Sequence, residues 1–458
     1  MFSLLGTAGL VGFILARPTD LFDSLRNLPL LYVFVALALL GLVIDIRYGY
    51  LRWRWSPPLV IAGLFFGWCL FTSAVFSPGD LGDNVKELAI VLVVVFFIGQ
   101  APQSLRALEV IATTVLVCSL FIAVVVVHQG TQPNVCVAID PADGHTSMGR
   151  PDDRPCRTIT QCYISPPEPQ SVYRCEHHGA FGLTSIGHGR VRYAGVLHDP
   201  NEVALTVCAA IPLALGLYRR RKRRLAYGVV FALMLGFAFM ATIYSQSRGG
   251  ILVMLAALGV FFIERFGLKG AVGGGLAGLP LLLLGGRSGG SADASTNERI
   301  ECWFTGMRMF VENPFVGVGY NRFTEHHHLT AHNSVVLAAA ENGFVGLLLW
   351  TSVIYFALKM SYQARIQLKG PEKAVARDWS MAILGSTAAV AVGSFFLSFN
   401  YHYVFWIYLA MAGTLYRAIR RHEPRFECKF GVTDLALLFV ANSFLVVALY
   451  GYTAFKLS

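Results

Sequence analysis

Charged side chains are scarce in this sequence: Asp, Glu, Lys and Arg together make up only 14% of its 458 residues. Hydrophobic residues make up 55%, and the mean hydropathy is +0.57. A soluble domain cannot bury that much apolar sequence. The chain also lacks an obvious tandem repeat, a low-complexity tail and a nucleotide-binding motif. The composition therefore excludes a soluble protein and indicates a polytopic membrane protein.

Long apolar segments recur throughout the chain and predict an all-α fold with twelve or thirteen membrane-spanning helices. No small-residue cleavage site follows the first segment, so we expect it to be a retained anchor. The expected spans lie near residues 1–16, 30–46, 58–76, 85–100, 107–128, 199–217, 225–243, 250–264, 268–286, 334–358, 379–399, 402–417 and 433–455.

Basic residues outnumber acidic ones, which gives a formal net charge of +10, but they are grouped between the apolar segments. The main clusters are RYGYLRWR at 47–54, RRRKRR at 219–224, the loop at 359–377 and RAIRRHEPRFECK at 417–429. If all four clusters face the cytoplasm, alternating spans satisfy the positive-inside rule. Membrane topology therefore explains the charge, and no nucleic-acid partner is expected.

This topology places two long loops, 129–198 and 287–333, on the opposite side of the membrane. The first loop contains four cysteines and no CxxC pair, which favours two disulfides in an oxidising compartment over a zinc site. Three pairings remain open for Cys136, Cys156, Cys162 and Cys175. The pattern fits a bacterial inner membrane with periplasmic loops. The expected regions are 1–128 with five spans, 129–198, 199–286 with four spans, 287–333, and the C-terminal membrane region 334–458.

Arg192 lies just outside the sixth expected span, within the stretch RVRYAGVLHDPNEVALTV. Asp199 is expected to cap that span, with Pro200 in its first turn. The free backbone N–H groups of a helix start, beside Asn201, suit a phosphate group. The alternative for Arg192 is an interfacial side chain that reaches towards lipid head groups.

Two further arginines are candidates for binding an anion. Arg248 lies in YSQSRGG, a very short turn between two spans, where glycines permit close approach of another group. Arg299 follows STNE in the second loop, where Ser295 or Thr296 would cap a short amphipathic helix lying on the membrane surface. The alternatives are snorkelling for Arg248 and a solvated surface charge for Arg299.

The segment LTAHNSVVLAAAENGFVGLLLW places ionisable residues in and beside an expected span. Asn333 or Ser334 would cap the helix and leave His332 at the membrane edge, where a histidine can accept a proton near neutral pH. Glu341 lies within the span, which is costly, so we expect it to pair with an arginine or to face an aqueous cavity. An interfacial or capping histidine and a structural ion pair are the alternatives.

Several arginines and one histidine at the membrane edge suit a lipid-linked diphosphate, because planar guanidinium groups match phosphate oxygens. A nearby base could then activate an incoming hydroxyl group. The same spacing also describes a phosphate or anion transporter.

These segments resemble the signature of the O-antigen ligase and O-antigen polymerase superfamily. The resemblance covers residues 190–358 and rests on the runs NERIECWFTGMRMFVENPFVGVGYNRF and AHNSVVLAAAENGFVGLLLW, the segment RYAGVLHDPNEVA, and SRGG at 247–250. The matching positions are Arg299, Trp303, Pro314, Gly317, Gly319, His332, Asn333, Glu341, Gly343 and Gly346, with Arg192, Gly195, Pro200 and Asn201 in the earlier segment. The loop at 129–198 departs from the family pattern because it is larger.

The resemblance implies a GT-C-like, metal-independent, inverting glycosyltransferase that uses a glycan on undecaprenyl diphosphate and no cofactor. Arg192 and Arg299, supported by Arg248, would neutralise the diphosphate. His332 would act as base or positioner for the acceptor hydroxyl, and Glu341 would orient local groups. Asn201 and Asn333 would belong to the substrate-binding set. The acceptor would be a lipid or a glycan, and membrane lipids and polysaccharide export machinery are candidate partners.

Several functions remain open after this resemblance. A polymerase would join lipid-linked repeat units, a ligase would move a finished glycan onto lipid A–core, and some relatives modify a protein hydroxyl. A lipid-linked glycan transporter would need the arginines but not His332, and an export scaffold would need neither. Surface-polysaccharide ligation or polymerisation is favoured, because the chain carries no added acceptor domain.

Overall fold

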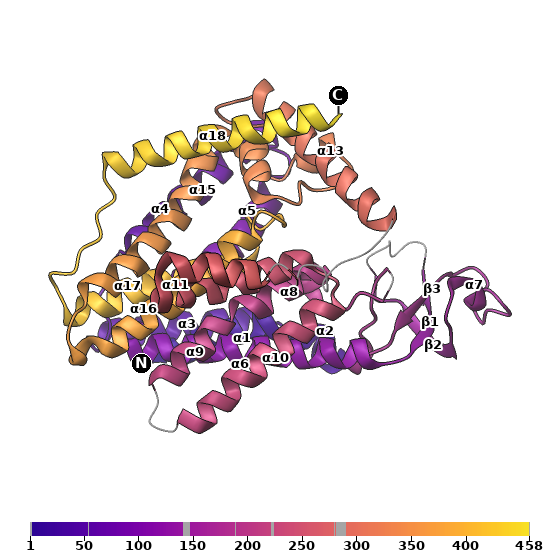
Figure 1. Ribbon diagram of the computed structural model, residues 1–458, viewed down its shortest axis with the longest axis horizontal. Coiled ribbons are helices and arrows are strands. Elements are labelled where there is room, and N and C mark those ends of the chain that lie inside the picture. Colours follow the sequence, from indigo (N-terminus) through magenta and orange to yellow (C-terminus); the bar gives the residue numbers. More distant parts are fainter. Residues whose placement is uncertain are drawn as a thin grey trace.

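The computed structural model describes residues 2–53, 55–140, 147–187, 189–220, 224–278, 280 and 290–457. The described part is a bundle of long helices with a small sheet at one end (Figure 1). Nine of its helices are long and apolar enough to cross a membrane, judged by length and composition. The prediction of an all-α polytopic membrane protein is therefore confirmed. The N-terminus lies at the left of the bundle and the C-terminus at the upper right (Figure 1).

The helices follow the expected spans closely. Those of the first half are α1 (Phe2–Ala16), α2 (Pro18–Leu21), α3 (Leu30–Arg47), α4 (Pro57–Phe76), α5 (Leu81–Gln100), α6 (Leu105–Thr131), α7 (Ile159–Cys162), α8 (Pro200–Ala209) and α9 (Ile211–Arg220). Those of the second half are α10 (Arg224–Tyr244), α11 (Arg248–Gly278), α13 (Gly290–Glu312), α14 (Phe323–His326), α15 (Ser334–Gln367), α16 (Ala374–Gly393), α17 (Tyr403–His422) and α18 (Val432–Leu457).

Three of these helices, α5, α16 and α17, are each 20 residues long but are not among the nine apolar candidates. Each carries charged residues near one end, such as Lys86 in α5 and Arg417 in α17, and these lower its apolar content. All three pack against other helices of the bundle. Added to the nine candidates, they account for twelve of the thirteen expected spans.

The eighth and ninth expected spans form one element, α11, which is interrupted at Gly267. Gly267 has a φ of 65°, a backbone conformation that glycine adopts without steric cost. A Cβ placed on Gly278 would lie 2.6 Å from Cδ2 of Leu255, so the chain folds back after the interruption. Residues 279 and 281–286 of the ninth expected span lie outside the described residues.

The loop at 129–198 contains a three-stranded antiparallel sheet with the order β2-β1-β3. Its strands are β1 (Asn134–Ile139), β2 (Arg150–Pro155) and β3 (Val172–His177). Disulfides join Cys136 to Cys162 and Cys156 to Cys175. The buried half-cystines and Tyr173 form a small core separate from the main one. Two disulfides were predicted here, and the structure selects one of the three pairings.

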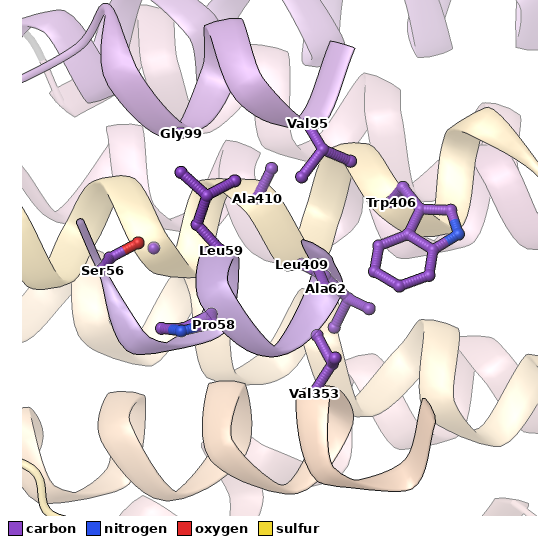
Figure 2. A pocket seen from close by; sticks show the side chains of 11 residues that line it. Ser56, Pro58, Leu59, Ala62, Val95, Gly99, Val353, Trp406, Leu409 and Ala410 are labelled. Atoms are coloured by element: carbon purple, nitrogen blue, oxygen red, sulfur yellow. The ribbon is translucent and has the colours of Figure 1, made fainter. Parts of the chain in front are cut away.

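A small apolar cavity lies in the bundle between α4, α5, α15 and α17 (Figure 2). Its volume of about 10 Å³ has room for roughly one water molecule. Leu59 and Trp406 line it, and the hydroxyl of Ser56 has no hydrogen-bond partner among the described residues. The cavity is a packing gap, far too small for a glycan or a lipid.

Candidate active site

The start of α15 is held in place by hydrogen bonds to the segment that links α16 and α17. Asn333 is the N-cap, as predicted, and its side-chain oxygen accepts from the backbone N–H groups of Val335 and Val336. The hydroxyl of Ser334 donates to the carbonyl of Leu397 at 2.7 Å. These bonds fix the backbone immediately after His332, so the position of the imidazole is defined by the bundle.

His332 lies just before this cap in a left-handed conformation, with a φ of 49°. Its backbone N–H donates to the hydroxyl of Ser398 at 3.0 Å. Its imidazole makes no hydrogen bond within the part of the chain that the structure describes. The ring is thus available to a ligand, and its unusual backbone conformation is of the kind that gathers at functional sites.

Three charged residues act on the His332 imidazole: Arg299 on α13, its neighbour Glu298, and Asp199 at the start of α8. Burial lowers the pKa of His332 below its ordinary value, Arg299 lowers it further, and the two carboxylates oppose that shift. The neutral ring is therefore favoured at neutral pH. A neutral imidazole beside a guanidinium group can accept a proton from a hydroxyl while the cation faces an anion.

A second group of residues lies around the start of α8. Asp199 caps the helix as predicted, and a capping box with Glu202 completes the cap. Arg190 donates from Nε to the carbonyl of Ser245 at 3.0 Å and from a terminal nitrogen to Oδ1 of Asn201 at 3.4 Å. These bonds join the α8 start to the turn before α11, whose first residue is the exposed Arg248. Arg190 therefore links Asn201 to the turn that precedes Arg248.

Arg192 is placed differently from the other arginines. Its side chain is fully buried, at 0% exposure, and donates to the carbonyls of Thr184 and Ser147 at 2.9 and 2.8 Å. Burial lowers the pKa of Arg192 to about 10, with a further contribution from the nearby Arg174. Its role in donor binding stays a prediction. The side-chain contacts join segments of the 129–198 loop to each other, and the backbone N–H of Arg192 donates to Oε1 of Gln129 in α6 at 2.9 Å.

The structure gives Glu341 hydrogen-bond partners other than an arginine. Its carboxylate accepts from the backbone N–H of Phe323 at 3.1 Å and from the hydroxyl of Tyr401 at 2.8 Å. Backbone N–H groups of Asn321 and Arg322 also act on it. The expected arginine pair is therefore wrong for the part of the chain that the structure describes. The carboxylate instead satisfies the donors of a tight turn, which compensates for burying its charge.

Helix α15 is interrupted directly after Glu341, at Gly343, where φ is 64°. The turn formed by residues 314–319 enters this interruption. Val318 and Gly319 donate to the carbonyls of Ala340 and Glu341, each at 2.9 Å, and Phe344 donates to the carbonyl of Pro314 at 2.8 Å. The two glycine-containing motifs are therefore one interlocked backbone element, in which each supplies the hydrogen bonds that the other lacks.

Helix α13 departs from the short surface helix that was expected. It begins at Gly290, so Ser295 and Thr296 are interior positions and not caps. Its apolar residues Met307 and Phe310 are buried in the main core, because the helix packs against α15 and α18. This packing carries Arg299 to the start of α15, beside His332.

Sequence reasoning missed Tyr401, whose hydroxyl reaches both Glu341 and the side chain of Asn342. The tyrosine lies in a short link between two expected spans, and no local motif marks it. Arg190 is likewise absent from the predicted site. The RVRY pattern could have indicated it, because residues two apart in an extended segment point to the same side, and Arg190 therefore shares a side with Arg192.

Comparison with protein families gives one match, to the O-antigen ligase family model over residues 233–351. That segment includes Arg248, Arg299, His332 and Glu341, together with the interlocked motifs at 314–319 and 341–346. A comparison with curated proteins found no match. The match supports the resemblance to the O-antigen ligase and O-antigen polymerase superfamily over residues 233–351, about a quarter of the chain.

Proposed function

We propose that this protein is a glycosyltransferase that moves or polymerises a glycan carried on undecaprenyl diphosphate at the periplasmic face of a bacterial inner membrane. The observation that carries the proposal is the meeting of His332 with Arg299 and Asp199, three residues from distant parts of the chain. The family match supports the substrate class.

The reaction assigns each of these groups a task. Neutral His332 takes the proton of the acceptor hydroxyl as its oxygen attacks the anomeric carbon of the donor sugar. The bond from that carbon to the diphosphate oxygen breaks with inversion, and its electron pair leaves on undecaprenyl diphosphate. Arg299, with Arg248 and Arg190 beside Asn201, stabilises the charge that develops on the leaving group. The chemistry uses no metal ion.

Asp199 caps α8 and faces His332, so it can stabilise the protonated imidazole that forms during transfer. The disulfide-linked loop at 129–198 lies at one end of the helix bundle (Figure 1), and we infer that it contacts the acceptor.

The test is product analysis with the purified chain in lipid, an undecaprenyl-diphosphate glycan and EDTA. We expect released undecaprenyl diphosphate and a transferred or lengthened glycan. His332→Gln should lower the rate on the order of 100-fold or more, and Arg299→Gln on the order of 100-fold. His326→Gln and Arg308→Gln, at exposed positions of the same exported region, are the matched controls.

The product pattern separates the subclasses, because a polymerase yields a ladder of lipid-linked repeats and a ligase yields one acceptor-linked glycan. Donor binding without transfer to any lipid, glycan or protein acceptor would contradict the enzyme and favour a transporter. Full transfer by His332→Gln would contradict the assigned base.

A further inference from the structure

A second polar site lies at the far end of the bundle from His332, where α3 and α17 end. A cavity of about 760 Å³ opens there, large enough for a head group or a small phosphorylated molecule. Four arginines line it: Arg52, Arg417, Arg420 and Arg421. No acidic side chain is among the lining residues that the structure describes.

The absence of carboxylates from this cavity stands out against the rest of that end of the bundle. Arg219 and Arg365 both pair with Glu264, at 2.8 Å each, and Lys359 pairs with Asp434 at 2.6 Å. Arg220 pairs with Glu109, and Lys373 pairs with Glu423. By contrast, the four cavity arginines form no ion pair with any residue in the described ranges.

Arg417 shows this most clearly, because it is only 6% exposed. Its terminal nitrogens donate to the carbonyl and side-chain oxygens of Gln100 at 3.2 and 2.8 Å, and to the carbonyl of Pro102 at 3.4 Å. These neutral oxygens orient the guanidinium but do not neutralise it. Its Nε has no hydrogen-bond partner within the described chain. A buried cation of this kind is costly unless an anion approaches it.

Aromatic residues complete the cavity. Tyr50, Trp55 and Tyr416 line it, and Arg420 lies over the Tyr416 ring at 5.7 Å from its centroid. Tyrosine and tryptophan favour the level of lipid head groups, and basic pockets between membrane helices on the cytoplasmic side bind phosphate-bearing head groups. The basic clusters at 47–54 and 417–429 predict that this end is cytoplasmic.

We propose that this arginine cavity is a binding site for a phosphate-bearing anion, either the head group of an anionic phospholipid or a soluble phosphate compound. Guanidinium groups match phosphate oxygens in geometry and charge, and four of them converge here with no internal counter-ion. The site is independent of the proposed transfer reaction. Along α17, which begins two residues after Tyr401, the first cavity residue is Tyr416, about 20 Å from the start of the helix.

The purified full-length chain in neutral detergent would be titrated with phosphatidylglycerol, cardiolipin or phosphatidylcholine, and separately with inorganic pyrophosphate. Native mass spectrometry would count the bound molecules and give the affinity. Arg52→Gln with Arg421→Gln removes two exposed cavity charges without disturbing buried packing. Lys369→Gln with Arg425→Gln removes two exposed charges from neighbouring connections outside the cavity and is the matched control.

We expect the cavity double variant to weaken binding about 10- to 30-fold and the control double variant to stay within about twofold. Selective binding of the anionic lipids identifies a head-group site, whereas pyrophosphate binding of comparable affinity identifies a soluble ligand. The proposal is overturned if no phosphate compound binds, if phosphatidylcholine binds as well as the anionic lipids, or if both double variants behave alike.

Discussion

Gly317 packs directly against the backbone of Glu341, so that a Cβ at Gly317 would lie 2.4 Å from the Glu341 carbonyl carbon. Gly343 makes the reciprocal contact, because its Cβ would lie 2.3 Å from the carbonyl carbon of Phe315. Both glycines have positive φ values, of 69° and 64°. The glycines of the two motifs are therefore required by a backbone-to-backbone contact, and their role is to hold the carboxylate of Glu341 under the 321–323 turn.

Gly317→Ala should destabilise the protein by about 2 to 4 kcal/mol, because the methyl group overlaps backbone atoms and the positive φ strains any L-residue. Gly236→Ala in α10 is the control, since a Cβ there meets nothing within 4 Å. Thermal unfolding of the two variants in the same detergent compares them. Equal melting temperatures would show that the 314–319 turn does not occupy the interruption in α15.

Tyr401→Phe should destabilise the protein by about 1 to 2 kcal/mol, because the buried carboxylate of Glu341 loses its hydroxyl donor. Tyr403→Phe is the matched control two positions further along, where the hydroxyl makes no hydrogen bond within the described residues. Chemical unfolding would measure both variants. A larger effect at Tyr403 would contradict the assigned partner of Glu341.

The rate of glycan transfer should rise with pH through the pKa of His332 and then level off, because the neutral imidazole is the active form. Burial and Arg299 lower that pKa, so the plateau should extend below the range expected for an exposed histidine. Arg299→Gln removes a cation, which raises the pKa of His332 and moves the acid limb of the profile to higher pH. Arg308→Gln on the same helix is the control and should leave the pH profile unchanged. An unchanged profile in Arg299→Gln would contradict the effect of Arg299 on the pKa of His332.

Peptide mapping under non-reducing conditions should recover Cys136 linked to Cys162 and Cys156 linked to Cys175. Replacing Cys136 and Cys162 together by serine should destabilise the 129–198 loop by about 3 kcal/mol, since the cross-link restricts the conformations of the unfolded loop. Limited proteolysis would report this as faster cleavage within 129–198, with the helices unaffected. A Cys118→Ser variant, which removes a free thiol in α6, is the control.

The sequence allowed the prediction of features that depend on neighbours along the chain. Asp199 and Asn333 cap their helices as expected, because capping is decided within three or four residues. The four loop cysteines were identified as disulfides, but the pairing depends on the register of β1, β2 and β3. The start of α13 was wrong because the helix continues upstream of Ser295 to Gly290.

Glu341 shows why the remainder of the site could not be predicted. The sequence indicates that a carboxylate within a span needs compensation, but not which groups supply it. The hydroxyl of Tyr401 lies 60 residues away along the chain, and the other donors are backbone N–H groups, which every residue except proline possesses. Only the three-dimensional arrangement reveals that a turn and a tyrosine take the place of an arginine.

The interruption of α15 also fixes an order for the biogenesis of the protein. A chain made from its N-terminus supplies Trp68, whose indole donates to the carbonyl of Asn342, and then the 314–319 turn before Gly343 is synthesised. The broken helix therefore emerges into the membrane with its backbone partners already present. Tyr401 follows later, so the carboxylate of Glu341 receives its last donor only when α17 is inserted. The surroundings of Glu341 therefore form in two steps: the 314–319 turn is synthesised before Glu341, and Tyr401 is synthesised 60 residues after it.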